Sequence, residues 1–171
     1  MKKNILLMFT VLVLLVGCAT KSPDITPVVN FDADKYLGRW YEIARIDNFF
    51  EKDMSYVYAD YHLNKNGSIS VINSGLAPGS DVRKYMNGVA KFVKNRATAY
   101  LEISFVRPFY TDYIVFRLED NYQYSYVGGG DKDHLWLLSR TPQVSKEIKG
   151  DFIARANALG YDIGKVIWVK Q

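Results

Sequence analysis

The feature that most constrains the fold is a series of short apolar segments, separated by turn signals, with no helical period between them. The first covers residues 40–45, and the next two, 56–63 and 68–74, flank Asn66-Gly67, the strongest short hairpin signal in the chain. Five more segments follow at 88–94, 98–106, 111–118, 124–129 and 135–140. Eight antiparallel strands without intervening helices predict an all-β fold, either a sandwich or an up-and-down barrel.

One helix is predicted after these strands. Ser145 suits the N-cap, Glu147 complements the dipole in the first turn, and Gly160 suits the position beyond the last turn. A single apolar stripe lies between them, formed by Ile148, Phe152, Ala156 and Leu159. Because only one face needs burial, we expect the helix to lie against the outside of the sheet, before a short final strand at 165–170.

Residues 1–17 are expected to be a lipoprotein signal peptide. Lys2 and Lys3 precede a twelve-residue apolar run that is short for a membrane span and typical of a secretory signal. Cys18 is the only cysteine, and with Leu15-Val16-Gly17 before it the site resembles a bacterial lipobox, in which the cysteine becomes the acylated first residue. The alternative, a disulfide, has no partner in the chain.

The lipobox also implies a cellular location. Ala19, in place of Asp, favours the outer membrane of a Gram-negative cell, with the domain facing the periplasm. Residues 18–30 contain two prolines and no periodicity, which predicts an acylated cysteine and a flexible tether. The remaining residues, 31–171, suit one domain with a single core.

Several functional classes are disfavoured. The net charge is +4, two units of which lie in the signal peptide, and no stripe of Lys and Arg suggests a nucleic-acid surface. His62 and His134 are the only histidines; they lack metal-ligand spacing or a neighbouring nucleophile and are expected at the surface. We therefore expect no enzyme, metal or cofactor. The residual enzymatic option is an acid–base pair such as Glu42 with a tyrosine.

Three motifs then occur in a fixed order: Gly38-x-Trp40, Thr111-Asp112-Tyr113, and Arg140 in "LWLLSRTP". They resemble the G-x-W motif of the lipocalins, the T-D-Y motif in the turn before their sixth strand, and the basic residue that ends their eighth. With the lipobox, the chain is most similar to the bacterial outer-membrane lipoproteins of that family. The resemblance spans 31–171 and implies an eight-stranded antiparallel up-and-down barrel, with one C-terminal helix packed outside and a short final strand.

The resemblance also implies roles for the motif residues. Trp40 would form the floor of the barrel, Gly38 would let the backbone pass closely beneath it, and the Arg140 guanidinium would pack over the indole. Such a cation–π contact contributes about 1–2 kcal/mol when desolvated. Gly38, Trp40, Thr111, Asp112 and Arg140 are therefore expected to be structural.

Strand alternation from an inward Trp40 gives the candidate lining. On the sixth and seventh segments the parity stays open, because both faces are apolar or aromatic. For every candidate, plain core packing is the alternative to ligand contact. The nine candidates are Glu42, Ala44, Ala90, Phe92, Leu101, Ile103, Phe105, Tyr113 and Tyr126.

A deep apolar cup suits an acyl chain, which gains about 0.8 kcal/mol per buried methylene. Arg83, Lys84 and Arg107 would meet an anionic head group, or are simply solvated loop charges. We therefore expect a protein that binds, stores or transports fatty acids or lysophospholipids for membrane maintenance or a stress response. The alternatives are a small lipid-modifying enzyme and an assembly lipoprotein, whose outer surface, including Phe49 and Phe50, would contact a partner, a membrane or a second copy in a homodimer.

Overall fold

The computed structural model describes residues 24–48 and 51–171. The signal peptide, the predicted acylation site Cys18, and Phe49 and Phe50 of the alternative contact surface lie outside the described residues. The first described residues join the domain earlier than expected. Ile25 is buried, and Val28 exchanges backbone hydrogen bonds with Ala99 and Val115, so the later part of the expected tether belongs to the barrel wall.

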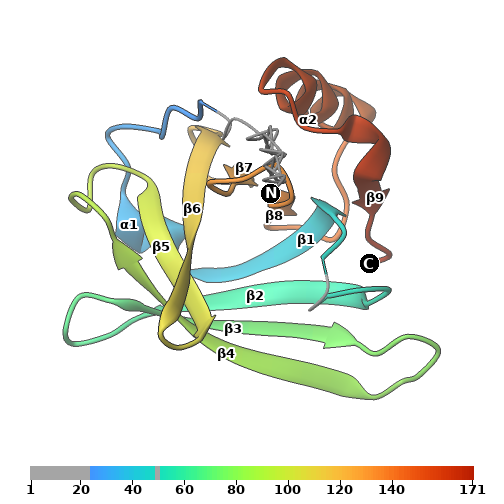
Figure 1. Ribbon diagram of the computed structural model, residues 1–171, viewed down its shortest axis with the longest axis horizontal. Coiled ribbons are helices and arrows are strands. Elements are labelled where there is room, and N and C mark those ends of the chain that lie inside the picture. The colour runs from blue at the N-terminus through green and yellow to red at the C-terminus, as the bar shows by residue number, and fades with distance from the viewer. Residues whose placement is uncertain (1–23, 49–50) are drawn as a thin grey trace, which may run out of the picture.

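Eight strands form one closed antiparallel barrel (Figure 1). Each consecutive pair is joined as a hairpin, and the first strand pairs with both the second and the eighth, which closes the sheet. This arrangement confirms the expected up-and-down barrel. The strands are β1 (Gly38–Ile46), β2 (Ser55–Leu63), β3 (Ile69–Leu76), β4 (Arg83–Phe92), β5 (Tyr100–Val106), β6 (Phe109–Leu118), β7 (Tyr124–Gly128) and β8 (Leu135–Ser139).

Helix α2 (Lys146–Ala158) packs on the outside of the barrel, as expected. The hydroxyl of Ser145 accepts a hydrogen bond from the backbone N–H of Ile148, and Gly160 follows the helix with a φ of 78°. Phe152 and Ala156 are fully buried. The final strand β9 (Val166–Trp168) pairs with β1 beside the barrel, after a 3-10 turn at Ile163–Lys165.

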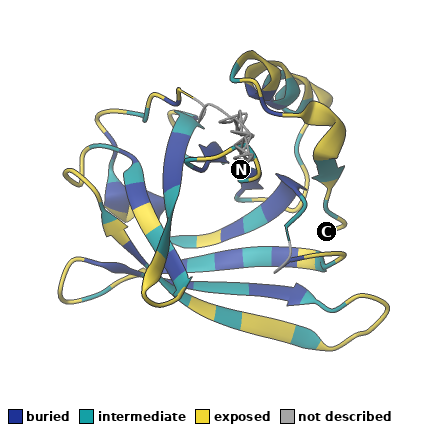
Figure 2. Ribbon diagram, viewed as in Figure 1, coloured by how far each residue is buried: buried dark blue, intermediate teal, exposed yellow. Residues whose placement is uncertain are grey.

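Two apolar layers result from this arrangement. One fills the lower barrel interior around Trp40, and the other lies between the barrel wall and α2 around Phe152. Buried residues concentrate on β1, β7 and β8, whereas Ala90 is the only buried residue of β4 (Figure 2). The short helix α1 (Ala33–Tyr36), which the sequence pattern did not predict, closes one end of the barrel.

Candidate ligand-binding site

Trp40 and Arg140 close one end of the barrel. Trp40 is fully buried, and its Nε1 donates a 2.8 Å hydrogen bond to the carbonyl of Tyr36. The Arg140 guanidinium lies 3.9 Å from the centre of the indole ring and donates 2.7 Å hydrogen bonds to the carbonyls of Arg39 and Lys35. Arg140 therefore ties the end of β8 to the start of β1, the contact that the resemblance implies.

Gly38 has a φ of 88°, a conformation that favours glycine, and a Cβ there would lie 3.6 Å from the Arg140 Nη1. The backbone turn at Gly38 thus lets the chain enter β1 directly beside the Arg140 guanidinium.

A hydrogen-bonded chain of hydroxyls lies above this floor. The Tyr113 hydroxyl is 2.8 Å from that of Tyr36 and 3.0 Å from that of Tyr61, and the Tyr36 hydroxyl is 3.1 Å from that of Ser125. Burial raises the pKa of Tyr36 to about 12 and raises the pKa of Tyr61 and Tyr113 as well. These neutral phenols satisfy one another, so the layer above Trp40 is polar in its hydrogen bonding but carries no charge.

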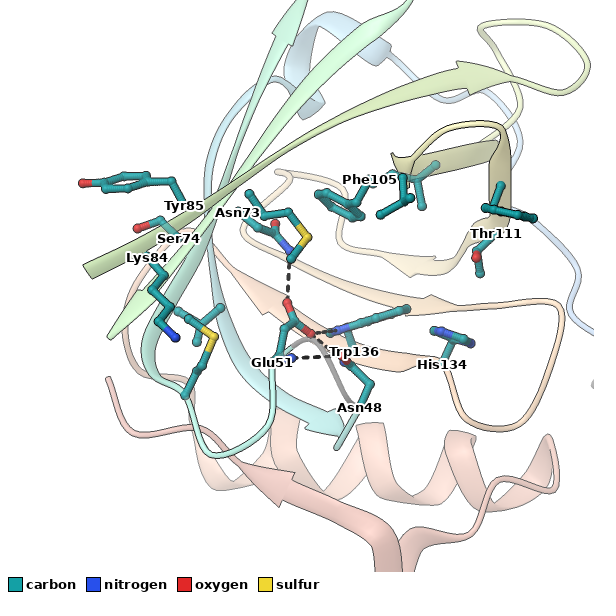
Figure 3. Close-up of a pocket in the computed structure, with 16 residues that line it drawn as sticks. Asn48, Glu51, Asn73, Ser74, Lys84, Tyr85, Phe105, Thr111, His134 and Trp136 are labelled. Atoms are coloured by element: carbon teal, nitrogen blue, oxygen red, sulfur yellow. Dashed lines mark hydrogen bonds between the residues drawn. The ribbon is translucent and has the colours of Figure 1, made fainter. Parts of the chain in front are cut away.

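A cavity of about 290 Å³ opens above the floor, towards the other end of the barrel. Its walls come from β2 to β6, β8 and the connection between β1 and β2 (Figure 3). Most of the lining is apolar, which suits a hydrophobic ligand. The apolar contributors include Met54, Val57, Met86, Ile103, Phe105 and Trp136.

The structure divides the predicted lining residues by depth. Ile103 and Phe105 line the cavity. Ala90, Leu101 and Tyr113 lie deeper, around a residual space of only about 10 Å³ that Ile103 also borders, so they pack the floor. Phe92 packs against the same interior layer, with its ring 6.5 Å from that of Phe31 at the closed end.

Two lining predictions are wrong. The pairing of β1 with β8 shifts between Glu42 and Ala44, and this bulge places Ala44 in the outer layer beneath α2. Tyr126 also faces outwards: its ring packs against Phe152 at 5.2 Å, and its hydroxyl donates to Asp151 on α2. The inward residues of β7 are Ser125 and Val127, on the strand whose parity the sequence left open.

The Thr111-Asp112-Tyr113 motif lies within β6, not in the turn before it, because β6 begins at Phe109. Thr111 lines the cavity, whereas the Asp112 carboxylate accepts a 2.9 Å hydrogen bond from the Tyr100 hydroxyl. His134, expected at the surface, also borders the cavity, at its mouth.

One wall of the cavity is acidic. The Glu51 carboxylate accepts hydrogen bonds from the Nδ2 of Asn73 at 3.0 Å, the Nδ2 of Asn48 at 2.7 Å and the indole nitrogen of Trp136 at 3.5 Å (Figure 3). Behind it the fully buried Arg45 donates to the Glu51 carbonyl. The wall thus presents a carboxylate whose orientation three side chains fix.

Glu42, predicted to line the cavity, belongs to this buried network and does not line the cavity itself. Its carboxylate pairs with Arg45 at 2.6 Å, and Arg45 also pairs with Asp47 at 3.0 Å. Burial and the charge of Glu51 raise the pKa of Glu42 well above its ordinary value, against the opposing effect of Arg45.

Sequence reasoning missed Glu51, Asn73 and Trp136. Residues 135–138 are apolar on both faces, so alternation carries no signal for Trp136. Glu51 lies in a connection, where no periodicity applies. The burial of a Glu in such a connection becomes visible only in the folded structure, from the side chains that hydrogen-bond to it.

The matches to known proteins agree with this geometry. A model of the lipocalin-like domain matches residues 31–171. The chain is 44% identical over 160 residues to the outer membrane lipoprotein Blc of Citrobacter freundii, covering 92% of this chain and 90% of that protein. It is 42% identical to Blc of Vibrio cholerae, covering 93% and 94%. The chain belongs to the lipocalin family.

Among lipocalins it is an outer-membrane lipoprotein of the Blc type, as the lipobox and motifs predicted. The barrel also superimposes on insecticyanin from the tobacco hornworm Manduca sexta with a TM-score of 0.69 and 23% identity, over 88% of this chain and 86% of that one, which shows the shared fold.

Family membership makes this lipocalin a binding protein for small hydrophobic ligands and confirms that it is not an enzyme. Within the described residues no group of three potential metal-ligating side chains comes together. In the same part of the chain, no helix is long and apolar enough to cross a membrane.

Proposed function

We propose that this lipocalin holds the acyl chain of a fatty acid or lysophospholipid in the cavity and thereby stores or carries lipids released at the outer membrane. The observation that carries the proposal is the apolar cavity of about 290 Å³, closed below by the Trp40–Arg140 contact and open above. Each methylene that enters gains about 0.8 kcal/mol, and a cavity with one closed end suits a chain with one polar end.

The charges favour an orientation with the tail inside. Glu51 lies in the cavity wall and repels a carboxylate or phosphate placed inside the cavity. Lys84 borders the cavity and is exposed. An anionic head group therefore meets a favourable charge only at the mouth.

The membrane attachment is part of the proposal. Cys18 would be the acylated residue, and its acyl chains together would anchor the protein stably. The tether would then hold the cavity close to a source of phospholipid and fatty acid, on the periplasmic face.

Titration with lipids tests the proposal. The chain from residue 18 onwards, carrying Cys18→Ser and stripped of lipid, is titrated with a lysophospholipid and with a fatty acid. Because Trp136 lines the cavity, we expect saturable quenching of tryptophan emission.

An Ile103→Phe variant adds bulk above the floor and should weaken binding about tenfold or more by obstructing the chain. Glu102→Gln, on the outer face of the same strand, is the matched control and should leave binding unchanged. The absence of saturable binding of either lipid class to the unsubstituted cavity would refute the proposed function.

A further inference from the structure

Two hairpins at the mouth expose large apolar side chains. Phe109 is 74% exposed and Val106 55% exposed on the β5–β6 hairpin, and Val82 and Tyr85 are both 64% exposed on the β3–β4 hairpin. Elsewhere among the described residues, the only large hydrophobic side chain with comparable exposure is Val29, at 65%. Isolated exposed hydrophobic residues are normal, but three of these four also border the cavity.

Basic residues alternate with these apolar side chains. Arg107 lies between Val106 and Phe109, and Arg83 and Lys84 lie between Val82 and Tyr85. In the described chain neither Lys84 nor Arg107 forms an ion pair. Such a surface suits an anionic bilayer. Its apolar side chains can enter the membrane interface, and its lysine and arginine side chains are attracted to the anionic lipids.

The β3–β4 hairpin carries one exposed acidic residue, Asp81, beside its two basic ones, and the turn of the β5–β6 hairpin carries none. Loop 129–134, between β7 and β8, carries Asp131 and Asp133, which pair with His134 at 2.7 Å and with Lys165 at 3.6 Å. The two hairpins therefore form an apolar side of the mouth with a net positive charge, from Arg83, Lys84 and Arg107 against Asp81, whereas loop 129–134 has a net negative charge, from two Asp against Lys132. An anionic surface would contact the first and avoid the second.

The start of the described chain allows such a contact. Ile25 packs against Gly128, where β7 passes into loop 129–134 at the mouth. Cys18 is seven residues earlier, a distance of at most about 24 Å of extended chain. This step rests on the proposed anchor at Cys18; the exposure and charge of the hairpins do not.

We propose that the β3–β4 and β5–β6 hairpins dock on the surface of an anionic phospholipid bilayer, with Phe109 and Val82 entering the interface and Lys84 and Arg107 meeting lipid phosphates. The mouth of the cavity then opens at the bilayer surface. A single-chain lipid can enter tail first while its head group stays at the interface, without crossing bulk water.

Vesicle flotation tests the docking. The chain from residue 18 with Cys18→Ser, which cannot be acylated, is mixed with phosphatidylcholine vesicles containing or lacking about a third phosphatidylglycerol. We expect binding to the anionic vesicles only, weakened by added salt. Phe109→Ser with Val82→Ser, and separately Lys84→Gln with Arg107→Gln, should each reduce the bound fraction at least fivefold.

Val29→Ser is the matched control, since it removes an equally exposed valine away from the mouth, and it should leave vesicle binding unchanged. Val82→Ser with Arg107→Gln, at two residues that do not border the cavity, should also lower vesicle binding but leave the affinity for a soluble lysophospholipid below its micellar concentration unaltered, which separates failure of docking from failure of the proposed function. Equal vesicle binding by all variants, or none by the parent, overturns the proposal. So does sedimentation that shows a dimer lost on Phe109→Ser, because the hairpins would then be an interface between two copies.

Discussion

The two ends of this barrel use similar side chains in opposite ways. At the closed end, aromatic rings leave a space of only about 10 Å³, and their hydroxyl and indole groups bond to one another or to backbone carbonyls. At the open end, aromatic and aliphatic side chains surround about 290 Å³ and continue onto exposed hairpins. At the closed end, tight packing and hydrogen bonding between side chains form a floor. At the open end, similar side chains leave a space unfilled, and that space can bind a ligand.

This difference between the two ends indicates which residues stabilise the fold and which bind the ligand. A buried ring that touches neighbours on all sides contributes its full transfer and packing energy, whereas a ring beside an empty cavity does not. Substitutions at the closed end should therefore affect unfolding, and those at the open end should affect ligand affinity.

The largest expected effect is at Trp40. Trp40→Ala removes a fully buried indole and its hydrogen bond to Tyr36, and we expect the free energy of unfolding in urea to fall by about 3–5 kcal/mol. Phe105→Ala at the open end, where the ring is only partly buried, should cost about 1–2 kcal/mol. Equal losses at the two sites would contradict the contrast between filled floor and open cavity.

Arg140→Ala should be next in size. The variant loses the cation–π contact with Trp40 and leaves the carbonyls of Arg39 and Lys35 without their donor, so we expect a loss of about 2–3 kcal/mol in the same measurement. Arg39→Ala is the control. Arg39 also stacks on a ring, that of Tyr58 at 3.8 Å, and pairs with Asp60 at 2.8 Å, but both contacts are solvent-exposed, and its removal should cost only about 1 kcal/mol.

Gly88 offers a smaller test at the open end. A Cβ there would lie 2.8 Å from the Phe105 ring, so Gly88→Ala forces the ring to move and should destabilise by about 1–2 kcal/mol while changing affinity for an acyl chain. Gly150→Ala in α2, where a Cβ meets nothing within 4 Å, should instead stabilise by about 1 kcal/mol. Unchanged ligand affinity in Gly88→Ala would show that the Phe105 ring does not shape the cavity.

The same contrast explains what the sequence could predict. The barrel, helix α2, its caps and the Trp40–Arg140 contact follow from alternation, turn residues and ordered motifs, because these signals are local or belong to the family. Alternation also placed Ile103 and Phe105 correctly on the inner face. It failed at Ala44, where one bulge reverses the faces of β1, and at Tyr126, where α2 buries the outer face as deeply as the interior.

The acidic wall escaped prediction for a different reason. Glu51 is held by Asn48, Asn73 and Trp136, which lie on separate segments that meet only in the closed barrel. No local pattern distinguishes this Glu from a solvated one. Its burial is a consequence of tertiary structure alone.

The pH dependence of folding gives the last and smallest test, and it concerns this wall. Because the pKa of Glu42 is raised in the folded state, the folded protein keeps a proton that the unfolded chain releases above about pH 4.5. More protons are then bound in the folded state, so this group makes stability fall as pH rises from the ordinary Glu pKa to the folded one. Glu42→Gln should flatten that decline, measured as unfolding free energy between pH 4.5 and 8.

Glu102→Gln, exposed on β5, should leave the decline unchanged. If Glu42→Gln instead loses stability relative to the parent as pH rises, the ion pair with Arg45 outweighs burial and the repulsion from Glu51. In that case Glu42 is charged across this pH range, and the wall carries one more negative charge than it would with a neutral, protonated Glu42. Such a wall would repel a buried anionic head group more strongly, so a head-out ligand would be favoured more strongly still.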